Sequence, residues 1–167
     1  HRDYLLLQSR VNLMATSQMS DLKANLMLTL SAVMLQFALT KVADHSYQGP
    51  TAQYWVLAAG ALTTILLCAY STMPKLPGKI RELRADEPLP KGFNLLHFGS
   101  FVQLPLSDFK RRMHTVLSSP PRTHDALMDE LHAHGKFIAT HKYAPLRLAY
   151  FTFLLTWVAA AILYSLA

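Results

Sequence analysis

Three long apolar stretches without charged residues divide the chain, from Ala24 to Thr40, from about Ser46 to Pro74, and from Leu148 to Ala167. A helix of about 20 apolar residues matches a hydrocarbon core about 30 Å thick, so each stretch is long enough to cross a membrane. The first is the shortest, and Lys23 and Lys41 at its ends can reach toward the headgroups. The pattern predicts an all-α membrane protein with three transmembrane helices.

The predicted elements divide the chain into four segments. We expect an amphipathic helix on the cytoplasmic membrane face over residues 1–22, a transmembrane hairpin over 23–74 with spans at about 24–41 and 51–74, a small helical cytoplasmic domain over 75–145, and a third transmembrane helix over 146–167. Inside the cytoplasmic domain, Ser107 and Thr123 are good N-caps for two helices. Pro145 predicts a kink or a restart just before the third span.

Small and polar residues within the spans predict where helices meet. Gly60 with Thr64, and Thr156 with Ala160, have the spacing that allows close helix contact. Gln36 lies near the middle of the first span and needs a hydrogen-bonding partner there. Another helix of the chain, another subunit or a pore lining would each satisfy it.

Charge is concentrated outside the spans. Residues 75–147 contain 12 of the 16 Lys and Arg residues of the chain, and much of the net charge of +6 lies beside span ends. The positive-inside rule accounts for this distribution without nucleic acid. It predicts that the N-terminus and residues 75–147 are cytoplasmic, and that the loop between the first two spans and Ala167 lie on the far side of the membrane.

The sequence contains no motif for catalysis or for a metal. It lacks a nucleophile elbow, a phosphate-binding loop and an HExxH pair, and its single cysteine, Cys68, lies within the second span. His134 and His141 share a helix face but lie two turns apart, too far for one ion without other ligands. We therefore expect no catalytic residue, no metal and no cofactor. Basic residues of the cytoplasmic domain suit either anionic lipid or a phosphate group.

Three motifs resemble a known family. They are Asp-Leu-Lys-Ala-Asn-Leu-Met-Leu at 21–28, Asn-Leu-Leu-His-Phe-Gly-Ser-Phe at 94–101, and the His-Gly-Lys to Ala-Tyr segment at 134–150. Together with the span layout they resemble PycTM, the transmembrane effector family of the bacterial Pycsar antiphage system, from about Asn12 onward. The chain departs from the family pattern at His134, where an apolar residue is usual, and at Pro145.

The resemblance implies a signalling function. In such a system a partner pyrimidine cyclase makes cyclic CMP or cyclic UMP after phage infection, and acts on the effector through this messenger without direct contact. The effector, which is not an enzyme, senses the nucleotide and disrupts the bacterial inner membrane, which causes abortive infection. Three spans are too few to enclose a wide pore, so we expect a homo-oligomer. The alternative is a membrane anchor that recruits a partner protein and binds no nucleotide.

The residues within these motifs suggest a nucleotide site. The candidates are Arg111, Arg112, Lys136 and Lys142 for the cyclic phosphate, Asn94 and His97 for the base edge, Phe98 or Tyr143 for stacking, and Gly99 for the backbone turn. Asp21 and Lys23 are expected to set the start of the first span. In the alternative, Phe98 and Phe101 are core residues and the motif is architectural.

Overall fold

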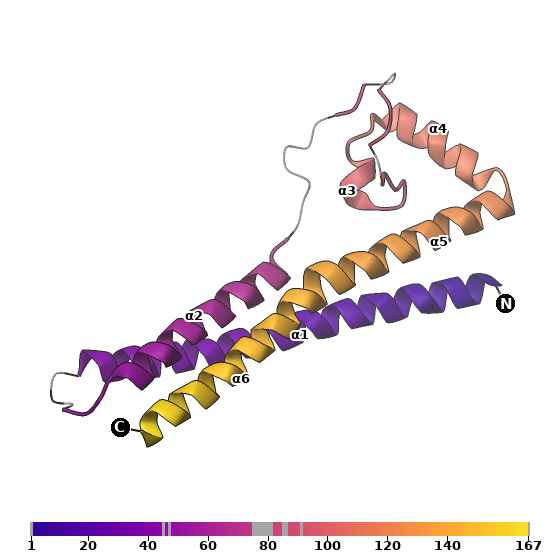
Figure 1. Cartoon of the computed structure of the whole chain (residues 1–167). Coiled ribbons are helices and arrows are strands. Elements are labelled where there is room, and N and C mark those ends of the chain that lie inside the picture. Colours follow the sequence, from indigo (N-terminus) through magenta and orange to yellow (C-terminus); the bar gives the residue numbers. More distant parts are fainter. Residues whose placement is uncertain are drawn as a thin grey trace. The chain divides into compact units, whose positions relative to one another are not determined.

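Helices form most of the part of the chain that the structure describes (Figure 1). The computed structural model describes residues 2–44, 46, 48–74, 82–84, 87–90 and 92–166. The helices are α1 (Arg2–Ala43), α2 (Ala52–Thr72), α3 (Phe98–Phe101), α4 (Leu106–Leu117), α5 (Pro120–Phe137), the π-helix η1 (Ile138–Tyr143) and α6 (Ala144–Ser165). The described residues contain no strand, and three helical segments are long and apolar enough to span a membrane. The predicted all-α class with three spans is confirmed.

Helix α1 combines two elements that the sequence pattern separated. It runs unbroken for 42 residues, so the amphipathic helix predicted over 1–22 and the first span form one helix. Residues 2–43 include neither glycine nor proline, the two residues that most strongly interrupt a helix. The backbone hydrogen bonds of α1 therefore continue without a break from its start into the first span.

The chain divides into two compact units, which we describe separately. The first consists of His1–Met14 with Pro74–Lys136, and the second of Ala15–Met73 with Phe137–Ala167. The three predicted spans belong to the second unit, which we call the bundle. The other unit contains α3, α4, most of α5 and the first residues of α1, and we call it the helical unit.

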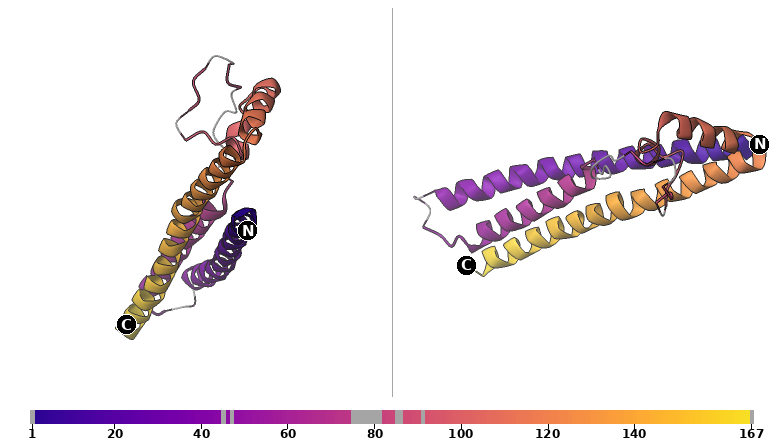
Figure 2. Two further views of the ribbon diagram at one scale, coloured as in Figure 1. Left: turned by 90° about the vertical axis from the view of Figure 1, so that its right-hand side faces the viewer. Right: turned by 90° about the horizontal axis from the view of Figure 1, so that it is seen from above.

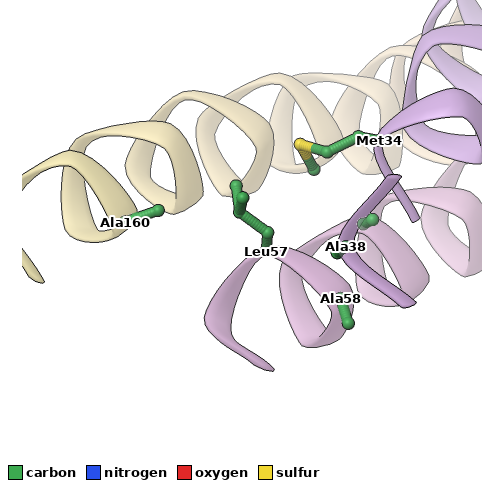
Figure 3. Close-up of a cluster of buried hydrophobic side chains, with 6 residues drawn as sticks. Met34, Ala38, Leu57, Ala58 and Ala160 are labelled. Atoms are coloured by element: carbon green, nitrogen blue, oxygen red, sulfur yellow. The ribbon is translucent and has the colours of Figure 1, made fainter. Parts of the chain in front are cut away.

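Within the bundle, α1 is buried along one stripe. Its buried residues follow one another at steps of four and three. These residues are Ser20, Ala24, Met27, Ser31, Met34 and Ala38. The spacing is that of a coiled-coil seam, and it is filled mainly by small residues and methionine. Met34 and Ala38 contact Leu57, Ala58 and Ala160, which joins α1 to α2 and α6 (Figure 3). In Figure 2 the second half of α1 lies beside these two helices.

Helices α2 and α6 approach closely where Gly60 faces Thr156. A Cβ atom on Gly60 would overlap with the side chain of Thr156, so only glycine allows this approach. Thr64, Thr156 and Ala160 are all buried in the bundle. Gly60 and Thr156, one residue from each predicted contact pair, therefore face one another.

In the helical unit, the start of α1 packs in parallel with α5. Asp3 contacts His124 and Arg10 contacts Glu130, at 2.6 and 3.8 Å. Glu130 is buried, and its second neighbour is the His134 ring at 4.0 Å. The hydrogen bond from the His124 ring lowers the pKa of the exposed Asp3 carboxyl below its ordinary value.

Two helices start earlier than their predicted caps. Helix α4 begins at Leu106 after Pro105, one residue before Ser107. Helix α5 begins at Pro120, a residue whose fixed φ suits the first helical position, so the predicted cap Thr123 lies inside the helix. Its hydroxyl instead donates to the Val116 carbonyl at 3.0 Å, which joins α5 to the end of α4.

At Pro145, where a kink or a restart was predicted, the helix type changes but the helix is not interrupted. Helices α5 and α6 are linked by the π-helical turn η1, and Pro145 lies at the start of α6. A proline lacks the N–H that the preceding turn would use, and a widened turn accommodates this loss while the chain stays helical.

Candidate functional site

A compact turn follows the connection between the two units and contains four of the predicted ligand residues. The carboxamide oxygen of Asn94 accepts a hydrogen bond from the Leu96 N–H at 2.9 Å, which closes an Asx turn. The short helix α3 then starts after His97, and Gly99 is buried within it. The side chain of Gln103 donates to the Gly99 carbonyl at 2.8 Å and locks the end of this turn.

The turn exposes one aromatic pair and packs another. The rings of His97 and Phe98 lie 5.2 Å apart, and Phe98 is 55% exposed. By contrast, Phe101 is half-buried and its ring lies 5.2 Å from that of Phe109 on α4. The architectural alternative therefore describes Phe101, whereas Phe98 is available to a planar ligand.

Helix α4 carries the adjacent arginines in different environments. Arg111 donates to the buried carboxylate of Asp108 at 2.7 Å, while two-thirds of its own side chain is exposed. Arg112 is half-buried, and its Nε atom has no hydrogen-bond acceptor among the described residues. A buried guanidinium donor without an acceptor is costly, whereas Arg111 already has a carboxylate partner.

Lys142 joins three elements of the bundle. Its ammonium lies 2.6 and 2.8 Å from the two carboxylate oxygens of Asp21, and 2.8 Å from the hydroxyl of Ser17, both on α1. The Lys142 carbonyl accepts a hydrogen bond from Ser71 of α2 at 2.9 Å. We call these four residues the Lys142 junction. It connects the π-helical turn to both helices of the hairpin.

The residues beside the junction have smaller roles. The hydroxyl of Tyr143 donates to the Thr16 carbonyl at 3.3 Å, which is a long hydrogen bond. Lys23 is exposed. The structure thus gives Asp21 a partner across the bundle in addition to its predicted place at the start of the first span.

The predicted ligand residues divide between the two units. Seven belong to the helical unit, namely Asn94, His97, Phe98, Gly99, Arg111, Arg112 and Lys136, and two, Lys142 and Tyr143, belong to the bundle. Sequence reasoning did not select Ser17 or Ser71, the two hydroxyl members of the Lys142 junction. Their hydroxyls have no recognisable motif, although Ser17 lies one helical turn before Asp21.

Within the described ranges, no three residues of the histidine, cysteine, aspartate and glutamate types gather as a metal site would require. Polar groups from different helices converge at the Lys142 junction and in the ion pairs between α1 and α5. These arrangements hold helices together.

The fold defines a three-span helical membrane protein in which the segment between the second and third spans forms most of the helical unit. The model of the Pycsar effector protein domain family, PycTM, matches residues 7–167, nearly the whole chain, and the chain belongs to this family. Comparison with curated proteins and with solved structures finds no match. Membership supports a role as a Pycsar effector in antiphage defence, and the family is not known as an enzyme family.

Proposed function

We propose that this protein senses a cyclic pyrimidine mononucleotide, cyclic CMP or cyclic UMP, through its helical unit and then disrupts the bacterial inner membrane. The observation that carries the proposal is the match of the Pycsar effector domain to residues 7–167. In this proposal the protein is an effector without catalytic activity of its own. A separate cyclase supplies the messenger and needs no direct contact with the effector.

The chemistry of the helical unit supports a nucleotide ligand. The exposed Phe98 ring with its neighbour His97 offers a surface on which a base can stack. Arg112 provides a guanidinium with an unused donor, and guanidinium groups bind phosphate well. These groups belong to the same compact unit, whereas Lys142 is already paired with Asp21.

The proposed orientation places the helical unit in the cytoplasm, where a nucleotide messenger is made, and the C-terminus in the periplasm. The excess of Lys and Arg between the second and third spans supports this orientation. Helix α1 and the helical segment from α5 to α6 each continue from the helical unit into the bundle. A ligand that shifts either helix would therefore act directly on a span.

The proposed active form is a homo-oligomer. To shift the ratio of active to resting protein from about 1:99 to 99:1, a ligand must bind the active state more tightly by roughly 5.5 kcal/mol. Several nucleotide sites can share this free energy more readily than one. Three spans also cannot enclose a wide channel alone.

Calorimetric titration of the detergent-solubilised full chain with cyclic CMP, UMP, AMP and GMP tests nucleotide sensing. The proposal expects selective binding of one pyrimidine nucleotide. Failure of all four to bind protein with a cooperative thermal transition would overturn nucleotide sensing. Co-purification of a partner protein regardless of nucleotide would then support a membrane anchor instead.

A further inference from the structure

The outward face of the first span carries two carboxamide groups. Asn25 and Gln36 are both exposed on α1, on the side away from the buried seam. Eleven residues are close to three helical turns, so the two side chains lie within about 20° of one another and about 16 Å apart along the axis. Thr29 and Ala32 occupy the positions between them and are also exposed. We call these four residues the α1 amide stripe.

The two amides differ from the exposed threonines of the spans, whose hydroxyls bond to their own helix. The hydroxyls of Thr29 and Thr40 donate to the carbonyls of Asn25 and Gln36 one turn earlier, at 3.0 and 2.9 Å. Thr63 and Thr152 on the other spans do the same. The side chains of Asn25 and Gln36 have no hydrogen bond to any described residue. A carboxamide has two donors and an acceptor oxygen that a helix cannot easily satisfy internally.

The depth of these groups makes their position costly for a single chain. With the apolar stretch of residues 24–40 centred on the bilayer, both amides fall inside a hydrocarbon core about 30 Å thick. Lipid chains offer no hydrogen-bonding partner, so polar side chains in spans normally face another helix. The chain's own bundle packs on the opposite face of α1, through Ser31 and its neighbours.

We infer that the α1 amide stripe is a contact surface for α1 of a second copy of this chain. All copies cross the membrane in the same direction, so equivalent helices of a symmetric oligomer run in parallel about an axis along the membrane normal. Asn25 then meets Asn25 and Gln36 meets Gln36 of the second copy, each pair at one depth. A carboxamide both donates and accepts, so identical residues satisfy one another.

The composition of the stripe suits such a contact. Ala32 lies between the two amides and allows close approach, as small residues do at helix interfaces in membranes. The flanking exposed positions are bulky and apolar, with Leu26 at 57% and Val33 at 63% exposed, and suit lipid. The inference deepens the proposed function because it names the surface of the proposed oligomer, and it rests on that assembly but not on nucleotide binding.

Disulfide crosslinking in native membranes tests this surface. In a Cys68→Ala background, Ala32→Cys places one thiol at the centre of the stripe, and Leu30→Cys is the control at nearly the same depth on an exposed position outside it. We expect oxidation to crosslink the Ala32→Cys chain to a dimer at least tenfold more than the Leu30→Cys chain. Equal crosslinking, or none at residue 32, would overturn the inference.

A second comparison identifies the hydrogen-bonding groups. Adding Asn25→Leu and Gln36→Leu to the Ala32→Cys chain should reduce dimer formation at least tenfold, whereas the off-stripe pair Leu26→Ala and Val33→Ala should not. An unchanged dimer fraction in the Leu variant would show that the amides do not hold the contact.

A water-soluble thiol reagent separates a helix contact from a pore lining. Rapid labelling of Ala32→Cys without nucleotide would show that the stripe faces water, and would contradict a contact between two α1 helices. We expect slow labelling. All these measurements omit nucleotide, so a chain that binds no nucleotide can still crosslink, and the two proposals fail independently.

Discussion

The ammonium of Lys142 lies between both carboxylate oxygens of Asp21, at 2.6 and 2.8 Å, and joins the π-helical turn to α1 across 121 residues of sequence. The Lys142 side chain is only 17% exposed, whereas that of Asp21 is 40% exposed. Removal of one partner leaves the other charge without its counter-ion in a partly dry site.

We expect Lys142→Met to destabilise the folded chain by about 1 kcal/mol, a value reduced from that of a buried pair because Asp21 is partly exposed. Thermal unfolding in detergent measures this change. Combination with Asp21→Leu should cost less than the sum of the single changes. Lys23→Met is the control, since Lys23 is exposed two residues away. A strictly additive double variant would show that the pair contributes nothing to stability.

Gly60 should tolerate no side chain. Gly60→Ala places a methyl group against Thr156 and should destabilise the bundle by about 1–3 kcal/mol, because α2 and α6 must separate or Thr156 must move. Thermal unfolding again measures the effect.

Gly135→Ala on α5 is the matched control for this change. A Cβ there meets only Leu13 at 3.8 Å, and alanine is the better helix former by roughly 0.8–1 kcal/mol. We therefore expect Gly135→Ala to be neutral or stabilising. If both alanine variants behaved alike, the close contact at Gly60 would be contradicted.

The pair between Asp3 and His124 makes the contact of α1 with α5 sensitive to acid. The His124 hydrogen bond holds the pKa of Asp3 below its ordinary value, so the folded state prefers the ionised carboxylate. The resulting stability is fully present above the ordinary aspartate pKa of about 3.9 and is lost as the pH falls through the lower, folded-state pKa.

Carboxyl NMR titration measures this shift. His124→Ala should return the pKa of Asp3 toward its ordinary value. Asp44, whose pKa is lowered by hydrogen bonds from Ser46, should not change. An Asp3 pKa that is the same with and without the imidazole would refute the assignment.

The proposed stacking surface predicts one affinity change. Phe98→Ala should weaken binding of the pyrimidine nucleotide about tenfold, since stacking of a base on an aromatic ring contributes roughly 1–3 kcal/mol. Leu106→Ala removes another exposed apolar side chain of the helical unit, 67% exposed, and should leave the affinity unchanged. Calorimetry of both variants makes the comparison. Equal affinity of Phe98→Ala and the unmodified chain would remove Phe98 from the site.

The periodic features of the chain could be predicted from sequence. The apolar stretches predicted the spans, and the spacing of Gly60 with Thr64 predicted a close contact, because span length and small-residue spacing are local properties. The continuity of α1 could also have been predicted from sequence, since no glycine or proline interrupts residues 2–43. We instead divided this helix where its composition changes from amphipathic to apolar.

Features that depend on distant partners were harder to predict. Lys142 was a candidate phosphate ligand because a lysine beside a family-like motif suits an anion, but the structure pairs it with Asp21. The widened turn before Pro145 accommodates the backbone hydrogen bond that proline cannot donate. A kink would have accommodated the same loss, so the sequence did not distinguish the two.

The most direct test of the central claim uses sealed lipid vesicles that contain the purified full chain and a trapped fluorescent dye. Cyclic CMP or cyclic UMP is added outside, with cyclic AMP as the control and protein-free vesicles as the blank. We predict dye release with one pyrimidine nucleotide, at concentrations that saturate its binding, and none with cyclic AMP. Vesicles that stay sealed while the protein demonstrably binds the nucleotide would contradict the account.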